Sequence, residues 1–265
     1  MKHKTGVFNR PWTELSMDRA LEAMAATGSE YIGLMLQHGK YVLTADSTPD
    51  EIEQLKLGIS QAGLQLVVIL TQVDLRAPLN EARKRIRRMI AVTKQAGARY
   101  LLTTGSDDSE LYERYYEVIA DSMSCAQDSG IKVALKPHGG LSATAQDCLR
   151  AIERIDSPSF SIWYDPGNIL HYTNSKPEQD VGTIAKHVTG VCIKDCDLST
   201  KQRDVMITPG DGDVDFAQVL GILQRAGFCG PCLIETVGGT TPEEITTQGS
   251  RAVAFVRKVL SGNAA

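Results

Sequence analysis

Residues 134–140 read Ala134-Leu135-Lys136-Pro137-His138-Gly139-Gly140, a short apolar run that ends in ionisable side chains. Three later segments have the same form: Trp163-Tyr164-Asp165-Pro166-Gly167-Asn168, Val191-Cys192-Ile193-Lys194-Asp195 and Leu233-Ile234-Glu235-Thr236. In a barrel of parallel strands, the active-site side chains come from the carboxyl ends of several strands. The four segments therefore predict strands that each deliver a polar side chain to one rim of a barrel.

The rest of the chain has the pattern that such a barrel needs, because apolar runs alternate with helix-period segments from end to end. Eight strands are expected at residues 5–8, 31–36, 65–70, 99–103, 132–136, 160–165, 188–194 and 231–235. Helices are expected between them at residues 17–26, 49–62, 79–96, 109–129, 143–155, 178–186, 215–226 and 242–260. We therefore predict one (β/α)8 TIM barrel over residues 1–265. A doubly wound open sheet is the alternative, but no glycine-rich dinucleotide fingerprint follows the first strand.

Composition fits a globular enzyme better than a nucleic-acid or membrane protein. The 265 residues are 42% hydrophobic and 23% charged, with a formal net charge of -4 and no linker that divides the chain. The acidic balance argues against a nucleic-acid partner. No segment is apolar enough for a membrane span or a signal peptide, so a cytoplasmic location is expected by default.

The six cysteines offer two alternative sites. Cys229-Gly230-Pro231-Cys232 matches the thioredoxin redox tetrapeptide, but here the motif follows a helix and leads into a strand, the reverse of the context that activates the thiol. A zinc site that joins this pair to Cys192 and Cys196 has suitable ligands. It is disfavoured because Cys192 and Cys229 fall at opposite ends of neighbouring strands.

The direction of each rim side chain follows from the period of two along a strand. One set of residues is expected to face the surrounding helices: Leu135, Tyr164, Val191 and Ile234. The next set is expected to point inward at the mouth of the barrel: Lys136, Asp165, Cys192 and Glu235.

The spacing and the amino-acid sequences of these segments resemble the motifs of the xylose-isomerase-like TIM-barrel superfamily of sugar isomerases and epimerases. The resemblance is strongest from Val133 onward and includes the Gly-x-Gly loop at residues 209–216. It implies a small-molecule carbohydrate substrate and a homodimer or homotetramer. It also implies a Glu, Asp, His and Glu set that holds one divalent metal, where this chain has Lys136, Asp165, Cys192 and Glu235.

Two of these four positions differ from the family set, and the charges of the four side chains suggest what replaces the metal. The family set around a divalent ion sums to -1, as do Asp165, Glu235 and a protonated Lys136 without a metal. An ammonium about 4 Å from a divalent ion would be repelled by roughly 8 kcal/mol at an effective dielectric constant of about 20. We therefore predict that the Lys136 ammonium takes or neighbours the metal position, bridged by the two carboxylates. A second interpretation keeps Mn or Zn on Asp165 and Glu235, completed by His138 or a Cys192 thiolate.

Sugar isomerisation requires removal of a proton beside a carbonyl and stabilisation of the resulting enediolate. Glu235 is the expected base, and Lys136 and His138 are expected to stabilise charge or return the proton. A Schiff-base role for Lys136 is disfavoured because two carboxylates would keep it protonated. The resemblance implies that epimerases of the family use two carboxylates, one on each face of the substrate. In this chain Lys136 occupies the position of one of those acids. Isomerisation, dehydration and a lyase reaction stay open, as does a noncatalytic sugar-binding barrel.

Substrate contacts are expected from residues that follow the strand ends: Asn9, Trp12, Asn168 and Lys194. Asp211 and Asp213 make the seventh loop a poor electrostatic host for phosphate, which favours a neutral or keto sugar.

Overall fold

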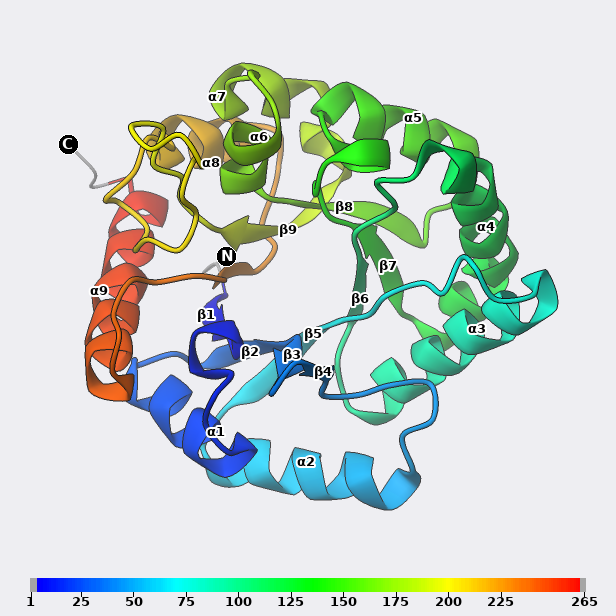
Figure 1. Cartoon of the computed structure of the whole chain (residues 1–265), viewed down its shortest axis with the longest axis horizontal. Helices are drawn as coiled ribbons and strands as arrows, with labels where there is room; N and C mark the ends of the chain where they lie inside the picture. Colours follow the sequence, from blue (N-terminus) through cyan, green and yellow to red (C-terminus); the bar gives the residue numbers. More distant parts are fainter. Residues whose placement is uncertain (1–3, 263–265) are drawn as a thin grey trace.

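The computed structural model describes residues 4–262, and their parallel strands close into a barrel in the order β1-β10-β9-β8-β7-β6-β5-β2 (Figure 1). The barrel strands are β1 (Thr5–Phe8), β2 (Tyr31–Leu34), β5 (Gln65–Leu70), β6 (Tyr100–Thr103), β7 (Lys132–Leu135), β8 (Phe160–Tyr164), β9 (Val188–Ile193) and β10 (Cys232–Ile234). This closure confirms the (β/α)8 barrel and excludes the open sheet. Residues 1–3 and 263–265 of the predicted domain lie outside the described part.

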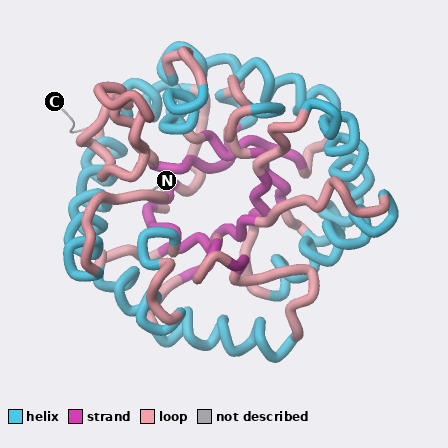
Figure 2. The backbone as a smooth tube through the Cα atoms, viewed as in Figure 1, coloured by secondary structure: helices cyan, strands magenta, loops and turns pink. Residues whose placement is uncertain are grey.

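Helices form a ring outside the strands (Figure 2). They are α1 (Met17–Ala26), α2 (Pro49–Gln61), α3 (Leu79–Gln95), α4 (Tyr112–Ser129), α5 (Ala145–Ile155), α6 (Pro166–Tyr172), α7 (Pro177–Asp180), α8 (Phe216–Arg225) and α9 (Pro242–Leu260). Three of the long helices start at a capping box, in which a threonine side chain and an acidic side chain satisfy each other's backbone N–H groups. The capping threonines are Thr48, Thr144 and Thr241.

The predicted helix at residues 178–186 is wrong. Residues 177–187 instead form the short helix α7 and two 3₁₀ turns, Val181–Thr183 and Ala185–His187, and the unpredicted helix α6 precedes them. Helix α6 begins directly after β8, because the Asp165 side chain accepts a hydrogen bond from the Asn168 backbone N–H (2.9 Å) and Pro166 occupies the first helical position. The sequence Asp-Pro-Gly-Asn is therefore the start of a helix.

The second barrel strand is two residues shorter than predicted. It ends at Leu34, and a small antiparallel hairpin of β3 (Leu36–Gln37) and β4 (Lys40–Tyr41) follows. Asn9 causes this break, because its side chain accepts from the Met35 N–H (2.7 Å) and donates to the Leu36 carbonyl (2.9 Å).

Apolar side chains form two separate layers, as the strand period predicts. The layer between strands and helices includes Leu135, Tyr164, Val191 and Ile234. The smaller layer inside the barrel includes Phe8, Met35, Val68, Leu102, Ala134, Trp163, Cys192 and Leu233. At the carboxyl ends of the strands, the inward positions that follow this inner layer carry polar residues. Cys232 belongs to the outer layer and Cys192 to the inner one, so the four-cysteine site does not form.

Between residues 4 and 262, no helix has both the length and the apolar character that crossing a bilayer requires.

Candidate functional site

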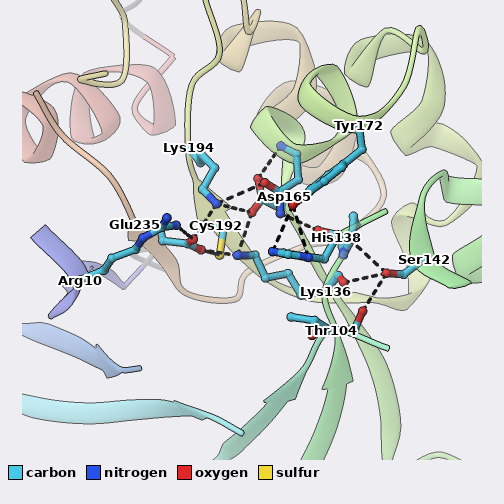
Figure 3. A network of polar contacts seen from close by, with 12 residues as sticks. Arg10, Thr104, Lys136, His138, Ser142, Asp165, Tyr172, Cys192, Lys194 and Glu235 are labelled. Atoms are coloured by element: carbon cyan, nitrogen blue, oxygen red, sulfur yellow. Dashed lines mark hydrogen bonds and ion pairs between the residues drawn. The ribbon is translucent and has the colours of Figure 1, made fainter. Parts of the chain in front are cut away.

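The four predicted rim residues meet at the carboxyl end of the barrel (Figure 3). Lys136 follows β7, Asp165 follows β8, Cys192 lies in β9 and Glu235 follows β10, and all four are buried. The Lys136 ammonium lies 3.0 Å from Asp165 Oδ2 and forms an ion pair and hydrogen bond with Glu235 Oε2. The two carboxylates therefore bridge the ammonium in the geometry that the sequence predicts.

Two further cations enter the same cluster. Lys194 Nζ lies 2.6 Å from Glu235 Oε1 and 3.5 Å from Asp165 Oδ2. Arg10, which follows β1, places Nη1 2.7 Å from Glu235 Oε1. We call these five residues, Arg10, Lys136, Asp165, Lys194 and Glu235, the ion cluster.

The ion cluster corrects the predicted charge balance. Three cations and two carboxylates give +1 when Cys192 is a thiol, whereas the sequence prediction counted only Lys136 and obtained -1. Burial raises the pKa of the Cys192 thiol well above its ordinary value, so its S–H group stays protonated and donates to Glu235 Oε2 (3.0 Å). The cluster therefore presents excess positive charge.

Glu235 is saturated with donors. Arg10 and Lys194 contact Oε1, and Lys136 and Cys192 contact Oε2. A carboxylate offers about four lone-pair sites. Burial would raise the pKa of Glu235, but Lys136, Lys194 and Arg10 outweigh it and hold that pKa well below its ordinary value. Glu235 thus has no lone pair and little affinity left for another proton.

The Lys136 pKa moves in the opposite direction. Burial alone would lower it, but the Glu235 and Asp165 carboxylates outweigh burial and raise the Lys136 pKa above its ordinary value. Lys136 therefore stays a cation through the physiological range, which also removes the free amine that a Schiff base requires.

Of the two Asp165 carboxylate oxygens, one accepts a hydrogen bond and the other does not. Its Oδ1 caps α6 through the Asn168 N–H, whereas Oδ2 is buried and has no hydrogen bond among the described residues despite its ion pair with Lys136. Sequence position alone does not reveal this division. Asp165 Oδ2 is thus held by charge alone, with the ammonium groups of Lys136 and Lys194 at 3.0 and 3.5 Å.

Two members of the ion cluster, Asp165 and Glu235, together with Cys192 form the one set of three potential metal donors found in residues 4–262. Their ligand atoms lie within 4.8 Å of one another. The carboxylate oxygens of this set are also the atoms that Lys136, Lys194 and Arg10 contact.

The remaining predicted contact residues have structural partners. Asn168 is buried, donates to the Pro137 carbonyl (2.7 Å) and accepts from Lys194 Nζ (3.2 Å), so it positions Lys194. Asn9 is buried and holds the β3–β4 hairpin. Trp12 is 1% exposed and donates from Nε1 to Thr246 Oγ1 (3.1 Å). The structure does not bring Asn9 or Trp12 into the cluster, and Arg10, between them, is the residue that reaches it.

His138 is a half-buried residue at the edge of the cluster, where Tyr172 Oη lies 3.4 Å from its Nε2. Burial lowers the pKa of His138, and Lys136 and Lys194 lower it further, so the imidazole is neutral at pH 7. Its loop is tightly fixed, because the His138 N–H donates to Ser142 Oγ (3.1 Å), as Figure 3 shows. A Cβ at Gly140 would lie 2.3 Å from the Ser106 carbonyl oxygen, so only glycine fits there.

A cleft of about 690 Å³ opens beside His138 at the same end of the barrel. It runs from Tyr41 and Gln72 past Thr104 and Asp107 to His138. A neutral imidazole therefore lies between an open cleft and the ion cluster.

Comparison with known proteins places this geometry in context. Residues 21–258 match the family described as xylose isomerase-like TIM barrel. The L-ribulose-5-phosphate 3-epimerase UlaE of Escherichia coli K12 is 24% identical over 180 residues, which cover 65% of this chain and 61% of that protein. The chain thus spans less than two thirds of the length of that curated relative.

Solved structures share the fold. The xylose isomerase domain protein from Planctomyces limnophilus superposes with a TM-score of 0.76 at 18% identity, over 98% of this chain and 99% of that one. The D-psicose 3-epimerase from Clostridium cellulolyticum H10, solved with D-tagatose, gives 0.77 at 15% identity, over 97% and 99%. At these identities the likeness establishes the barrel alone.

Proposed function

Because the chain belongs to the xylose isomerase-like TIM-barrel family, we propose that it is a carbohydrate isomerase or epimerase-type enzyme that removes a proton beside the carbonyl of a sugar. The observation that carries this proposal is the neutral His138 imidazole, which lines the cleft beside the buried cations Lys136 and Lys194. A base and a fixed positive charge are the two elements that enolisation needs.

His138 replaces Glu235 as the base in this proposal. Glu235 is the base expected from sequence, but four donors saturate its oxygens and its pKa lies well below the ordinary value. His138 is neutral, lines the cleft and has Tyr172 as its side-chain neighbour. Glu235 is then the counter-ion that fixes three cations in place.

The proposed reaction moves one proton between neighbouring carbons and one between their oxygens. His138 accepts the proton on the carbon beside the carbonyl, and the electron pair of that C–H bond forms the enediolate. The negative charge develops on the former carbonyl oxygen, where the ammonium groups of Lys136 and Lys194 stabilise it without having to reorganise. Return of the proton to the neighbouring carbon, together with transfer of the substrate's own hydroxyl proton to the former carbonyl oxygen, forms the new carbonyl and completes an isomerisation. This one-base course suits a site in which a lysine occupies one of the two acid positions of family epimerases.

We also propose that the Lys136 ammonium takes the place of the divalent metal that the family resemblance implies. The residues present do not fit such an ion, because three cations already contact the Asp165 and Glu235 oxygens and Cys192 retains its proton. The competing arrangement, with Mn or Zn on Asp165 and Glu235 completed by His138 or Cys192, would bring a divalent ion against those cations.

Rebuilding the family ligands tests this substitution. The double variant Lys136→Glu/Cys192→His is expected to bind Mn or Zn more tightly than the wild type, because it adds a carboxylate and an imidazole and removes a cation. Lys136→Met/Cys192→His is the matched control that removes the cation without adding a carboxylate. Titration calorimetry on the folded variants measures the affinity. Equal binding by wild type and double variant would contradict the proposed correspondence of positions.

Deuterium incorporation from D₂O into a panel of ketoses, aldoses and keto acids tests the enzymatic proposal. In at least one compound of the panel, we expect deuterium to replace the proton on the carbon beside the carbonyl. NMR measures this exchange. Loss of a hydroxyl would instead assign the dehydratase alternative. Binding without exchange would identify a noncatalytic sugar-binding barrel and refute the proposal.

The rate of exchange is expected to depend on the protonation of His138. A base acts when unprotonated, and the His138 pKa lies below its ordinary value of about 6.5. The rate is therefore expected to be flat from pH 7 to 8 and to fall as the pH decreases through the lowered pKa. A rate that rises with acidity between pH 7 and 5 would contradict His138 as the base.

The cytoplasmic location and the homodimer or homotetramer stay predictions.

A further inference from the structure

We propose that the ligand of the ion cluster carries a carboxylate, so that the substrate class is a keto sugar acid. The reaction in this inference rests on the proposed function. The class of ligand is inferred from the charge of the site and from its unused hydrogen-bonding groups. It revises the neutral or keto sugar that the sequence favours.

The first argument is the excess charge. Lys136 and Lys194 are 1% and 2% exposed, and with Arg10 they exceed the two carboxylates by one positive charge. The two buried lysines balance the two buried carboxylates, so the excess positive charge lies on Arg10, at the edge of the cluster that reaches solvent. A ligand with a single negative charge completes the balance, and a neutral sugar leaves it unmatched.

The second argument is the position of Arg10. Its side chain is 38% exposed, so it reaches solvent where both lysines do not. Within residues 4–262, its hydrogen bond runs from Nη1 to Glu235, which leaves Nε and Nη2 without a partner there. Two neighbouring guanidinium N–H groups match the two oxygens of a carboxylate. Glu235 fixes the guanidinium from one side while its other edge is free to bind a ligand.

Arg10 and Lys194 also lie close to each other, since both contact the same Glu235 oxygen at 2.7 and 2.6 Å. A carboxylate on Arg10 therefore places the adjoining carbonyl of a keto acid near Lys194. Asp165 Oδ2 forms ion pairs with Lys136 and Lys194 but no hydrogen bond, so it is the acceptor for a ligand hydroxyl that enters the cluster. Carboxylate, carbonyl and hydroxyl on neighbouring carbons are the pattern of a keto sugar acid.

A phosphate ester fits these groups less well. A phosphate brings nearly two negative charges, which would overturn the balance that one carboxylate restores. In TIM barrels the loops after the seventh and eighth strands often bind phosphate. Here the loop after β9 carries Asp211, paired with Arg251, and Asp213, which accepts from the Leu198 N–H (2.8 Å).

Calorimetric binding of three matched probes tests the inference. 2-Keto-D-gluconate and D-fructose differ at C1, where one has a carboxylate and the other a hydroxymethyl group, and D-fructose 6-phosphate supplies the phosphate. We expect 2-keto-D-gluconate to bind about tenfold or more tightly than either of the others. Arg10→Gln is expected to abolish that preference, and Arg10→Lys to restore part of it. The matched control Arg19→Gln, which changes an exposed arginine of α1 outside the cleft, is expected to retain it.

Equal binding of the acid and D-fructose, tighter binding of the phosphate, or an acid preference that survives Arg10→Gln in folded protein would overturn the inference. These results are separable from the proposed reaction. Exchange into D-fructose without an acid preference would leave the enzymatic proposal intact and remove this one. An Arg10-dependent acid preference without exchange into any probe would support the inferred class of ligand and count against the enzymatic proposal.

Discussion

His138→Gln is expected to lower the rate of deuterium exchange into a substrate by about 10²- to 10⁴-fold, the usual contribution of a general base. Glutamine retains polarity at the rim of the cleft but does not accept a proton at neutral pH. The main-chain contact between the His138 N–H and Ser142 Oγ is retained in the variant. The loop therefore keeps its anchor, and ligand binding is expected to weaken much less than chemistry.

Two controls separate chemistry from structure. His187→Gln makes the same change just before the amino end of β9, away from the rim, and is expected to leave the exchange rate unaltered. Tyr172→Phe removes the hydroxyl that contacts the His138 ring and is expected to have a small effect. Undiminished exchange in folded His138→Gln would assign the base to another residue.

Glu235→Gln is expected to lower the free energy of unfolding by about 3–5 kcal/mol, the range for removing one partner of a buried ion pair. The variant leaves Arg10, Lys136 and Lys194 facing one carboxylate, Asp165. Urea unfolding at pH 7 measures the loss. Glu30→Gln, at an exposed position, is the control and is expected to change stability little. Because this variant also disturbs Lys136 and Lys194, its activity alone does not identify the base.

The sign of the pH dependence follows from the lowered pKa of Glu235. Its stabilising contribution is fully present above the unfolded pKa of about 4.3 and is lost as the pH falls through the lower folded value. The difference in stability between wild type and Glu235→Gln is therefore expected to persist from pH 7 to 5 and to shrink below pH 4. A difference that stays constant down to pH 2 would show that Glu235 does not carry this charge stabilisation.

The fold and the inward residues could be predicted because both depend on local periodicity. Apolar runs alternating with helical segments indicate the barrel, and the period of two along a strand places Lys136, Asp165 and Glu235 on its inner side. The same period, continued from Cys192, points Lys194 inward. That signal was available, but it gave Lys194 a role in substrate contact without revealing its ion pair with Glu235.

The rest depends on contacts across the closed barrel. Arg10 and Glu235 are 225 residues apart and meet because β1 pairs with β10. Saturation of Glu235 by four donors is a property of that closure, and it is what moves the proposed base to His138. The helix start at Pro166 escaped prediction for a different reason: its cap uses Asp165, whose other oxygen belongs to the ion cluster.

The central claim is that buried ammonium groups stabilise the enediolate in place of a metal. Its most direct test is deuterium exchange by wild-type protein treated with chelator, with the metal content of the same sample determined by elemental analysis. The account predicts that exchange continues at an undiminished rate while the protein contains less than stoichiometric divalent metal. Exchange that disappears with chelation and returns with one equivalent of Mn or Zn would contradict it.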